Sequence, residues 1–189
     1  RRKAMRELSL NVMDIVQNSI RAGASLTTIR IDESVPGDTL AITVTDNGCG
    51  MSEEQVKSVI DPFFTTRTTR KVGLGVPLFK MEAEMTGGSF TIDSKLGAGT
   101  TLTAVFRPSH VDMIPLGDIG SVIHLLITCN PEIDFEYIRT KTGADGAEKR
   151  ASLDTRALRE QLGEIPFSEP EVSAWIRDYI AEMDGEIGA

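Results

Sequence analysis

The stretch DNGCGM at residues 46–51 decides how this chain of 189 residues is interpreted. Asp46 ends a run that alternates like a β-strand, so its carboxylate should be held firmly enough to accept a hydrogen bond from an exocyclic amine such as that of adenine. Gly48 and Gly50 allow positive φ and remove side chains, so the backbone can pass close to a flat ligand, while Met51 offers apolar packing. The same letters also predict a hairpin or Asx turn, and taken alone they favour neither interpretation.

A helix predicted upstream of this stretch carries two polar residues on one side. Residues 5–21 have the spacing of a helix that is apolar over most of its surface. Asp14 and Asn18 are four positions apart, so they lie together on its one polar stripe. Magnesium prefers hard oxygen ligands and keeps several waters, so one Asn carbonyl plus phosphate oxygens is a normal coordination. We therefore expect Asn18 to be a magnesium ligand and Asp14 to orient or deprotonate an attacking water. For each residue alone, a stripe that faces solvent is the simpler alternative.

The segment FFTTRTTRKVGLGV at residues 63–76 has the composition of a phosphate-binding loop. Hydroxyls, cations and two glycines come directly before a predicted helix, whose first N–H groups favour anions. The spacing matches neither the P-loop nor the dinucleotide fingerprint. A solvated surface loop would explain Arg67 alone but fits the whole set poorly. The expected phosphate contacts are Thr65, Thr66, Arg70, Lys71, Gly73, Leu74 and Gly75.

Composition excludes several classes of protein. The formal net charge of −8 argues against broad nucleic-acid binding, which needs clustered Lys and Arg. No apolar run reaches the roughly 18 residues of a membrane span, and the N-terminus lacks the apolar core of a signal peptide. Only Cys49 and Cys129 are present, too few for a secreted disulfide framework. We expect a cytoplasmic protein with reduced thiols and neither a membrane nor a nucleic-acid partner.

Periodicity predicts an N-terminal domain over residues 1–107 and a C-terminal extension over residues 108–189. In the first part, Ser52 should cap a short helix, and Gly87-Gly88 should end another. The strands expected there are residues 26–33, 39–45, 89–94 and 101–107, with the second helix at 76–85. The extension should pack on the first domain with strands at 122–128 and 135–140 and helices at 153–162 and 170–183.

The last predicted helix carries an apolar stripe of Val172, Trp175, Ile176, Tyr179 and Ile180. Most such stripes belong to a core, so burial is the expectation for all five residues. An interaction face that includes Trp175 and Tyr179 is the alternative.

In this order, the blocks resemble the Bergerat ATP-binding fold of the GHKL superfamily, over roughly residues 5–107. DIVQNSIRAGAS followed by DNGCGMS is similar to the MutL version, whereas DPFFTTR, GLGV and TGGSFTIDSKLGAGTTLTAVF resemble the histidine-kinase version. The resemblance implies an α+β fold, a two-layer α/β sandwich whose mixed sheet carries helices on one face. It also implies ATP and Mg²⁺ as cofactors, with magnesium held through Asn18, adenine read by Asp46, and Thr100 and Thr101 in the last glycine block.

Two departures from that family pattern concern catalysis. Hydrolytic members usually have Glu where Asp14 stands, and Asp is one methylene shorter, which leaves hydrolysis open. The kinase-type G-T-G-L-G is here Lys71-Val72-Gly73-Leu74-Gly75, in which Lys71 could serve as a phosphate cation.

The expected function is that of a regulatory histidine-kinase-like ATPase or protein kinase with a protein partner. His110 follows the last predicted strand of the first domain and His124 lies in an apolar run, so neither suits a phosphoacceptor. One alternative is a Ser/Thr protein kinase resembling bacterial anti-sigma factors, and another is a non-catalytic ATP-dependent switch. The ending after Pro108 resembles that of small ATP-binding proteins encoded beside clostridial iron hydrogenase genes, which implies an accessory role in redox metabolism.

Overall fold

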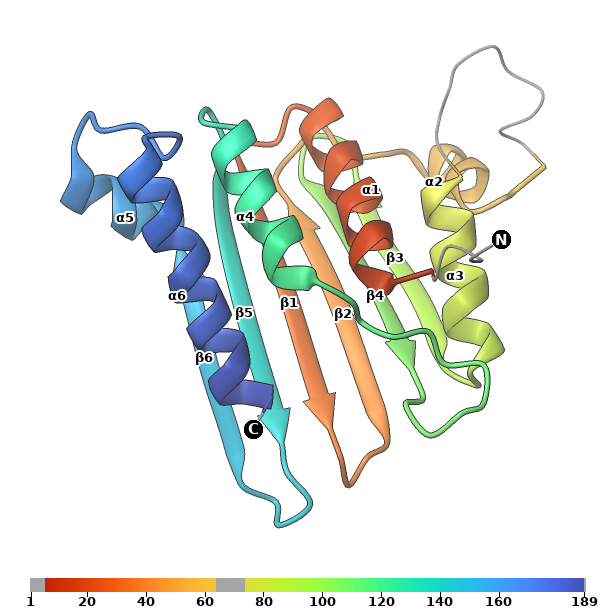
Figure 1. Cartoon of the computed structure of the whole chain (residues 1–189). Coiled ribbons are helices and arrows are strands. Elements are labelled where there is room, and N and C mark those ends of the chain that lie inside the picture. The colour runs from red at the N-terminus through yellow and green to blue at the C-terminus, as the bar shows by residue number, and fades with distance from the viewer. Residues whose placement is uncertain (1–5, 64–73, 189) are drawn as a thin grey trace, which may run out of the picture.

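The computed structural model describes residues 6–63 and 74–188, in which pairs of consecutive strands are separated by one or two helices (Figure 1). In chain order they are α1 (Leu8–Arg21), β1 (Leu26–Ser34), β2 (Thr39–Asp46), α2 (Glu53–Val59), α3 (Gly75–Met85), β3 (Ser89–Lys95), β4 (Gly99–Phe106), α4 (Ile119–Cys129), β5 (Asp134–Thr142), β6 (Glu148–Asp154), α5 (Thr155–Leu162) and α6 (Pro170–Gly188). The expected hairpin and the capped short helix are confirmed, since β1 pairs with β2 and Ser52 and Gln55 form a capping box at α2.

The described strands form one six-stranded sheet in the order β3-β4-β2-β1-β5-β6. The β1–β5 pair is parallel and the other four pairs are antiparallel, so the sheet is mixed. Helices α1, α3, α4 and α6 lie side by side on one face of this sheet (Figure 1). The predicted fold class, an α+β two-layer sandwich, is therefore confirmed.

The core lies between those helices and the sheet because the strand residues alternate between two faces. Ile29, Ile42 and Phe106 point to the helices and are fully buried, and the Phe106 ring lies 5.5 Å from that of Phe79 on α3. The opposite face is polar, as the hydroxyl contact between Thr43 and Thr103 at 3.1 Å shows. The same alternation brings the last residue of β2, Asp46, to the helix-covered side.

The C-terminal part of the chain extends the sheet of the first part. β5 pairs with β1 along the whole length of both strands, from Leu26 opposite Asp134 to Ser34 opposite Thr142. The strands before and after the domain boundary expected between residues 107 and 108 thus belong to the same sheet. The division into two domains remains a prediction.

Residues 122–128, expected to be a strand, belong to helix α4, and that prediction was wrong. The buried residues Ile119, Val122, Ile123, Leu126 and Ile127 recur at three- and four-residue spacings, as one face of a helix does. The Asp118 carboxylate accepts from Ser121 N at 3.0 Å and caps the helix start. A short apolar run rich in β-branched residues has the composition of a strand, so only the spacing indicated a helix.

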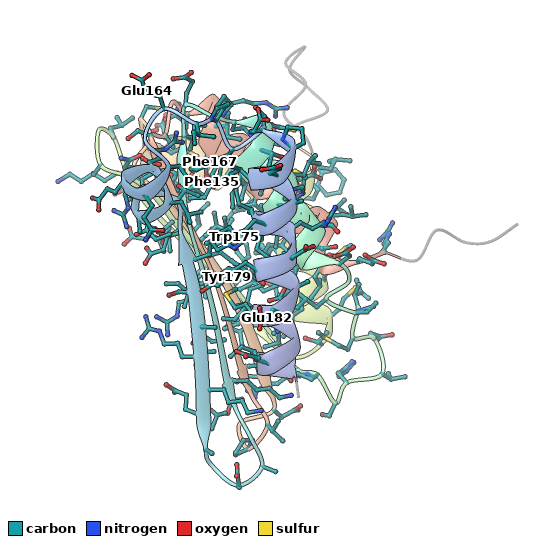
Figure 2. The ribbon with its side chains drawn as sticks, turned by 60° about the vertical axis from the view of Figure 1, so that its left-hand side comes forward. Phe135, Glu164, Phe167, Trp175, Tyr179 and Glu182 are labelled. Atoms are coloured by element: carbon teal, nitrogen blue, oxygen red, sulfur yellow. The ribbon has the colours of Figure 1, made fainter. Side chains whose placement is uncertain are left out.

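The extension contains two strands and three helices, and its second strand was missed. β6 lies at the edge of the sheet, and its first three residues, Glu148, Lys149 and Arg150, are exposed and charged. Such an edge strand has little apolar alternation, so its sequence resembles a polar loop. A second correction concerns α6, where Ile176 and Ile180 are buried as expected, but Trp175 and Tyr179 are 51% and 37% exposed (Figure 2).

A buried carboxyl in α3 gives the first testable prediction. Glu82 is 5% exposed and accepts from Asn11 Nδ2 at 2.5 Å. Burial raises the pKa of Glu82, while the hydrogen bond from Asn11 and the charge of Arg6 lower it less. A raised folded-state pKa stabilises the fold below the ordinary pKa of 4.5, and this contribution is lost as the pH rises through the folded value.

We therefore expect Glu82→Gln to increase the free energy of unfolding at neutral pH by about 1 kcal/mol, because the amide keeps an acceptor for Asn11 without a buried charge. Urea denaturation at several pH values measures this, and the gain should vanish in acid, where Glu82 is protonated in both states. The exposed Glu84→Gln on the same helix is the control. A gain that persists in acid would contradict the assignment to the buried charge.

Candidate functional site

A pocket of about 520 Å³ opens between α1, α2 and the neighbouring ends of β2, β3 and β4. Its walls are mostly apolar, with a small number of polar groups. The apolar side chains are Ile15, Ala22, Val44, Met51, Val59, Val76, Ile92 and Leu102. The polar ones include Asn18, Ser19, Asp46, Gln55 and Thr100. An apolar cleft with a few fixed polar groups suits a flat organic ligand whose edge forms hydrogen bonds.

The Asp46 carboxylate is fixed by two donors at the inner end of this pocket. Ser19 Oγ of α1 donates to Oδ2 at 2.6 Å, and the backbone N–H of Gly48 donates to Oδ1 at 2.9 Å. Asp46 itself is 9% exposed. Each carboxylate oxygen can accept more than one hydrogen bond, so both retain capacity for a ligand donor. Asp46 is thus placed to accept from an amine that enters the pocket.

The next residue, Asn47, holds the loop in place, a role that the sequence interpretation did not assign. Its Oδ1 accepts from the backbone N–H groups of Ser25 and Leu26 at 2.9 and 3.0 Å, and its Nδ2 donates to Ser25 Oγ at 2.9 Å. The side chain therefore ties the end of β2 to the start of β1. Its position directly after a strand could have predicted this role, because Asn side chains readily form hydrogen bonds with nearby backbone groups.

The two glycines of the loop serve different contacts. Gly50 lines the pocket with φ +66°, and a Cβ there would come within 2.0 Å of the Lys95 carbonyl oxygen. Gly48 is outside the pocket lining and has no positive φ, contrary to expectation. A Cβ on Gly48 would lie 2.9 Å from the Ala22 carbonyl, so this glycine lets the loop approach the end of α1.

The two threonines after the last glycine block face opposite sides of the sheet. Thr100 pairs with Asp46 and lines the pocket, where its Oγ1 lies 2.8 Å from Ser94 Oγ. Thr101 is on the other face, where its Oγ1 donates to Thr45 Oγ1 at 3.3 Å. Strand alternation thus excludes Thr101 from the lining, and its expected role at the pocket is not supported.

On α1, Asn18 lines the pocket and Asp14 lies one turn away, exposed. Within residues 6–63 and 74–188, neither side chain has a hydrogen-bond or ion-pair partner. The start of α3 packs against Asp14, because a Cβ on Gly75 would lie 2.9 Å from the Asp14 Cβ. Leu74 is half exposed at the N-cap of α3 and gives it no side-chain cap. The predicted contacts Thr65, Thr66, Arg70, Lys71 and Gly73 lie outside the described residues.

Comparison with known proteins identifies the family. Residues 5–110, more than half of the chain, match the family of histidine kinase-, DNA gyrase B- and HSP90-like ATPases. The chain therefore belongs to this family, as its motifs predicted. Because the family is one of ATPases, this membership supports ATP binding by the chain.

The relatives include sensor proteins of bacteria. The chain is 30% identical over 92 residues to the sensor histidine kinase ZraS of Escherichia coli, a match that covers 49% of this chain and 20% of ZraS. It is also 30% identical over 95 residues to the heme sensor protein HssS of Staphylococcus saprophyticus, which covers 50% of this chain and 21% of HssS. These matches thus span about a fifth of each relative's length.

Among solved structures, the chain is similar to the Aquifex aeolicus MutL ATPase domain complexed with ADP. The TM-score is 0.47 at 17% identity, and the match covers 82% of this chain and 66% of that one.

In the described part of the chain, no helix has the length and apolar character needed to cross a membrane.

Proposed function

We propose that this protein binds Mg-ATP in the pocket between α1 and the ends of β2 and β4 and uses it as a regulatory ATPase or protein kinase in the cytoplasm. One observation carries the proposal. The Asp46 carboxylate, held by Ser19 and Gly48 N, lies in a mostly apolar pocket of about 520 Å³. Adenine would stack on apolar side chains such as Val44 and Leu102, which lie side by side on the sheet, while its amine donates to Asp46.

The residues of α1 fit a magnesium ion bound with the phosphates. Asn18 presents an amide oxygen at the pocket, and the described residues contain no cluster of three or more His, Cys, Asp or Glu that could hold a metal by itself. Magnesium commonly uses few protein oxygens together with waters and phosphates, so a single Asn is sufficient. Bound there, the ion would neutralise phosphate charge. The uncapped start of α3 at Gly75 offers N–H groups for the same anion.

Binding is tested by calorimetry with ATP, with and without Mg²⁺. Wild-type protein should bind more tightly when Mg²⁺ is present, and Asn18→Ala should lose at least about tenfold in affinity, mainly in the magnesium-dependent part. Gln17→Ala, a neighbouring helix position outside the pocket lining, is the control. Absence of ATP binding by the wild-type protein would overturn the proposed function.

Asp14 is proposed as the general base because its exposed carboxylate lies one helical turn from Asn18. Asp14→Asn should preserve Mg-ATP binding and lower turnover by about a hundredfold, since the amide cannot accept the proton of water. Steady-state phosphate release and calorimetry on the same preparation measure the two quantities. Turnover that is unchanged in Asp14→Asn would exclude this role.

The fate of the phosphate separates the three candidate activities. With γ-labelled ATP and a protein partner recovered by pull-down with and without ATP, label on the partner would identify a protein kinase, including one of the anti-sigma type. Free labelled phosphate would identify an ATPase. Tight binding without either product would identify a nucleotide-dependent switch. An accessory role beside an iron hydrogenase remains part of the proposal and predicts a partner from redox metabolism.

A further inference from the structure

Helix α6 exposes two stacked aromatic rings on the side that faces away from the core. Ile176, Ile180, Met183 and Ile187 are buried against the sheet and α4. Trp175 and Tyr179 are 51% and 37% exposed, and their ring centroids lie 5.3 Å apart with planes inclined by 17°. Figure 2 shows Trp175, Tyr179 and Glu182 in succession along the helix. The aromatic pair is therefore ordered and accessible together.

Carboxylates occupy the same side of α6. Glu171, Asp178 and Glu182 are exposed and lie four residues before, three after and seven after Trp175, which are the spacings of one helical face. Together with Trp175 and Tyr179 they define the outer α6 surface. Asp178 pairs with Arg177 at 3.1 Å. In the described part of the chain no cation is within ion-pair distance of Glu171 or Glu182, so this surface has an excess of negative charge.

A groove between α5 and α6 adjoins Trp175. It has a volume of about 290 Å³ and is lined by Leu158, Gln161, Leu162, Glu171, Val172 and Trp175. Three aliphatic side chains and the indole therefore form a depression with a carboxylate at its margin. Isolated exposed aromatic residues are common, but a stacked pair that continues into an apolar groove is typical of a contact surface.

The charge distribution decides what kind of partner fits. A second copy of this chain docked face to face would oppose Glu171, Asp178 and Glu182 with the same residues, and like charges in an interface are costly. An anionic partner is disfavoured for the same reason. A segment with Lys or Arg complements the carboxylates, and such cations also bind favourably over Trp and Tyr rings. The groove requires that the segment carry apolar side chains too.

We propose that the outer α6 surface docks a cationic amphipathic segment of another protein, whose apolar side chains enter the α5–α6 groove beside Trp175 while its Lys or Arg residues face Glu171, Asp178 and Glu182. This inference does not depend on nucleotide binding. The surface lies beside edge strand β6, where Tyr179 Oη donates to the Ser152 carbonyl at 3.4 Å. The nucleotide pocket lies beyond β5 and β1, at β2 and β4.

The single tryptophan of the chain makes the surface directly observable. A short synthetic amphipathic helix of Leu and Lys is titrated into the full chain while Trp175 emission is followed, and the same peptide with Glu in place of Lys is the matched probe. We expect a saturable change in emission with the Lys peptide only. Glu171→Gln/Glu182→Gln, which keeps the fluorophore, should weaken that binding by about tenfold and reduce its salt dependence.

Two further variants control the experiment. Asp93→Asn/Glu54→Gln removes one exposed carboxylate on edge strand β3 and one on α2, and it should leave the affinity unchanged. Trp175→Ala, measured by anisotropy of a labelled peptide, should weaken binding by about tenfold or more. Equal binding of both peptides, or undiminished binding in Glu171→Gln/Glu182→Gln, would overturn the proposal. Self-association in sedimentation that Trp175→Ala abolishes would replace it with a homodimer.

Discussion

Replacing Asp46 with asparagine is expected to weaken Mg-ATP binding by about a hundredfold while leaving the fold intact. In the wild-type protein the carboxylate accepts from Ser19 Oγ and Gly48 N and retains lone pairs for the adenine amine. The asparagine oxygen can keep the bond from Gly48, and its amide nitrogen can donate to the Ser19 hydroxyl, which rotates to accept. The side chain at residue 46 then has one acceptor oxygen instead of two and no negative charge. The adenine amine therefore loses water on binding without gaining an equally strong hydrogen bond.

Calorimetry with Mg-ATP measures the affinity, and thermal unfolding followed by circular dichroism checks the fold. Asp93→Asn, the same substitution at an exposed position of β3, should bind ATP as the wild-type protein does. The expected combination is a midpoint of unfolding close to that of the wild type and an affinity about a hundredfold lower. If Asp46→Asn and Asn18→Ala both retain the wild-type affinity, the site assignment is wrong.

Two of the predicted site residues lie where local periodicity alone determines their position, and their roles in binding remain predictions. Asp46 at a strand end and Asn18 on the polar stripe of α1 reach one pocket because strand and helix periodicity fix their directions. The same alternation puts Thr101 on the far face of the sheet and outside the pocket lining, and its binding role remains a prediction. The positive φ predicted for Gly48 was wrong. Its lack of a side chain serves a close contact with Ala22 instead, and that contact could not be predicted because Ala22 is distant in sequence.

In the extension, tertiary contacts decided the structure where the sequence was ambiguous. Residues 122–128 have strand-like composition but become helix α4, since a helical face can bury Ile123 and Leu126 against α6 and the sheet. β6 has few apolar residues and becomes a strand by pairing with β5. Trp175 has the spacing of a core residue, yet Ile176 and Ile180 already fill the contact with the sheet. None of these outcomes follows from residue composition alone.

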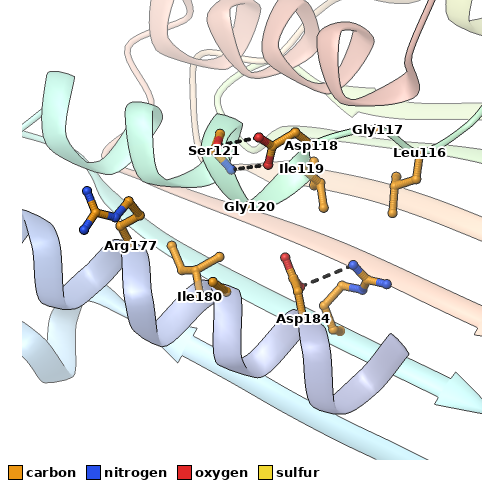
Figure 3. A pocket seen from close by; sticks show the side chains of 11 residues that line it. Leu116, Gly117, Asp118, Ile119, Gly120, Ser121, Arg177, Ile180 and Asp184 are labelled. Atoms are coloured by element: carbon orange, nitrogen blue, oxygen red, sulfur yellow. Dashed lines mark hydrogen bonds and ion pairs between the residues drawn. The ribbon is translucent and has the colours of Figure 1, made fainter. Parts of the chain in front are cut away.

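A buried ionic contact that attaches α6 to β5 leads to the second large effect. Asp184 Oδ1 of α6 accepts from Tyr137 Oη at 2.9 Å and from Arg139 Nη1 at 3.3 Å. Asp184 also lines a cavity of about 280 Å³ between α4 and α6 (Figure 3). Arg139 is 6% exposed, and its Nε has no partner among the described residues. Asp184 is therefore the one ion-pair partner recorded for this buried guanidinium in the described structure.

Asp184→Ala should lower the free energy of unfolding by about 3–5 kcal/mol, because it leaves the Arg139 charge buried without compensation and Tyr137 Oη without its acceptor. Urea denaturation measures the loss, and the exposed Asp178→Ala on the same helix should change stability by less than about 0.5 kcal/mol. The double variant Arg139→Met/Asp184→Leu should regain much of the loss, since burial of two apolar side chains replaces a pair whose desolvation is costly. If the double variant is as unstable as Asp184→Ala, the uncompensated charge is not the cause, and the loss lies in the hydrogen bond from Tyr137 or in packing around the cavity.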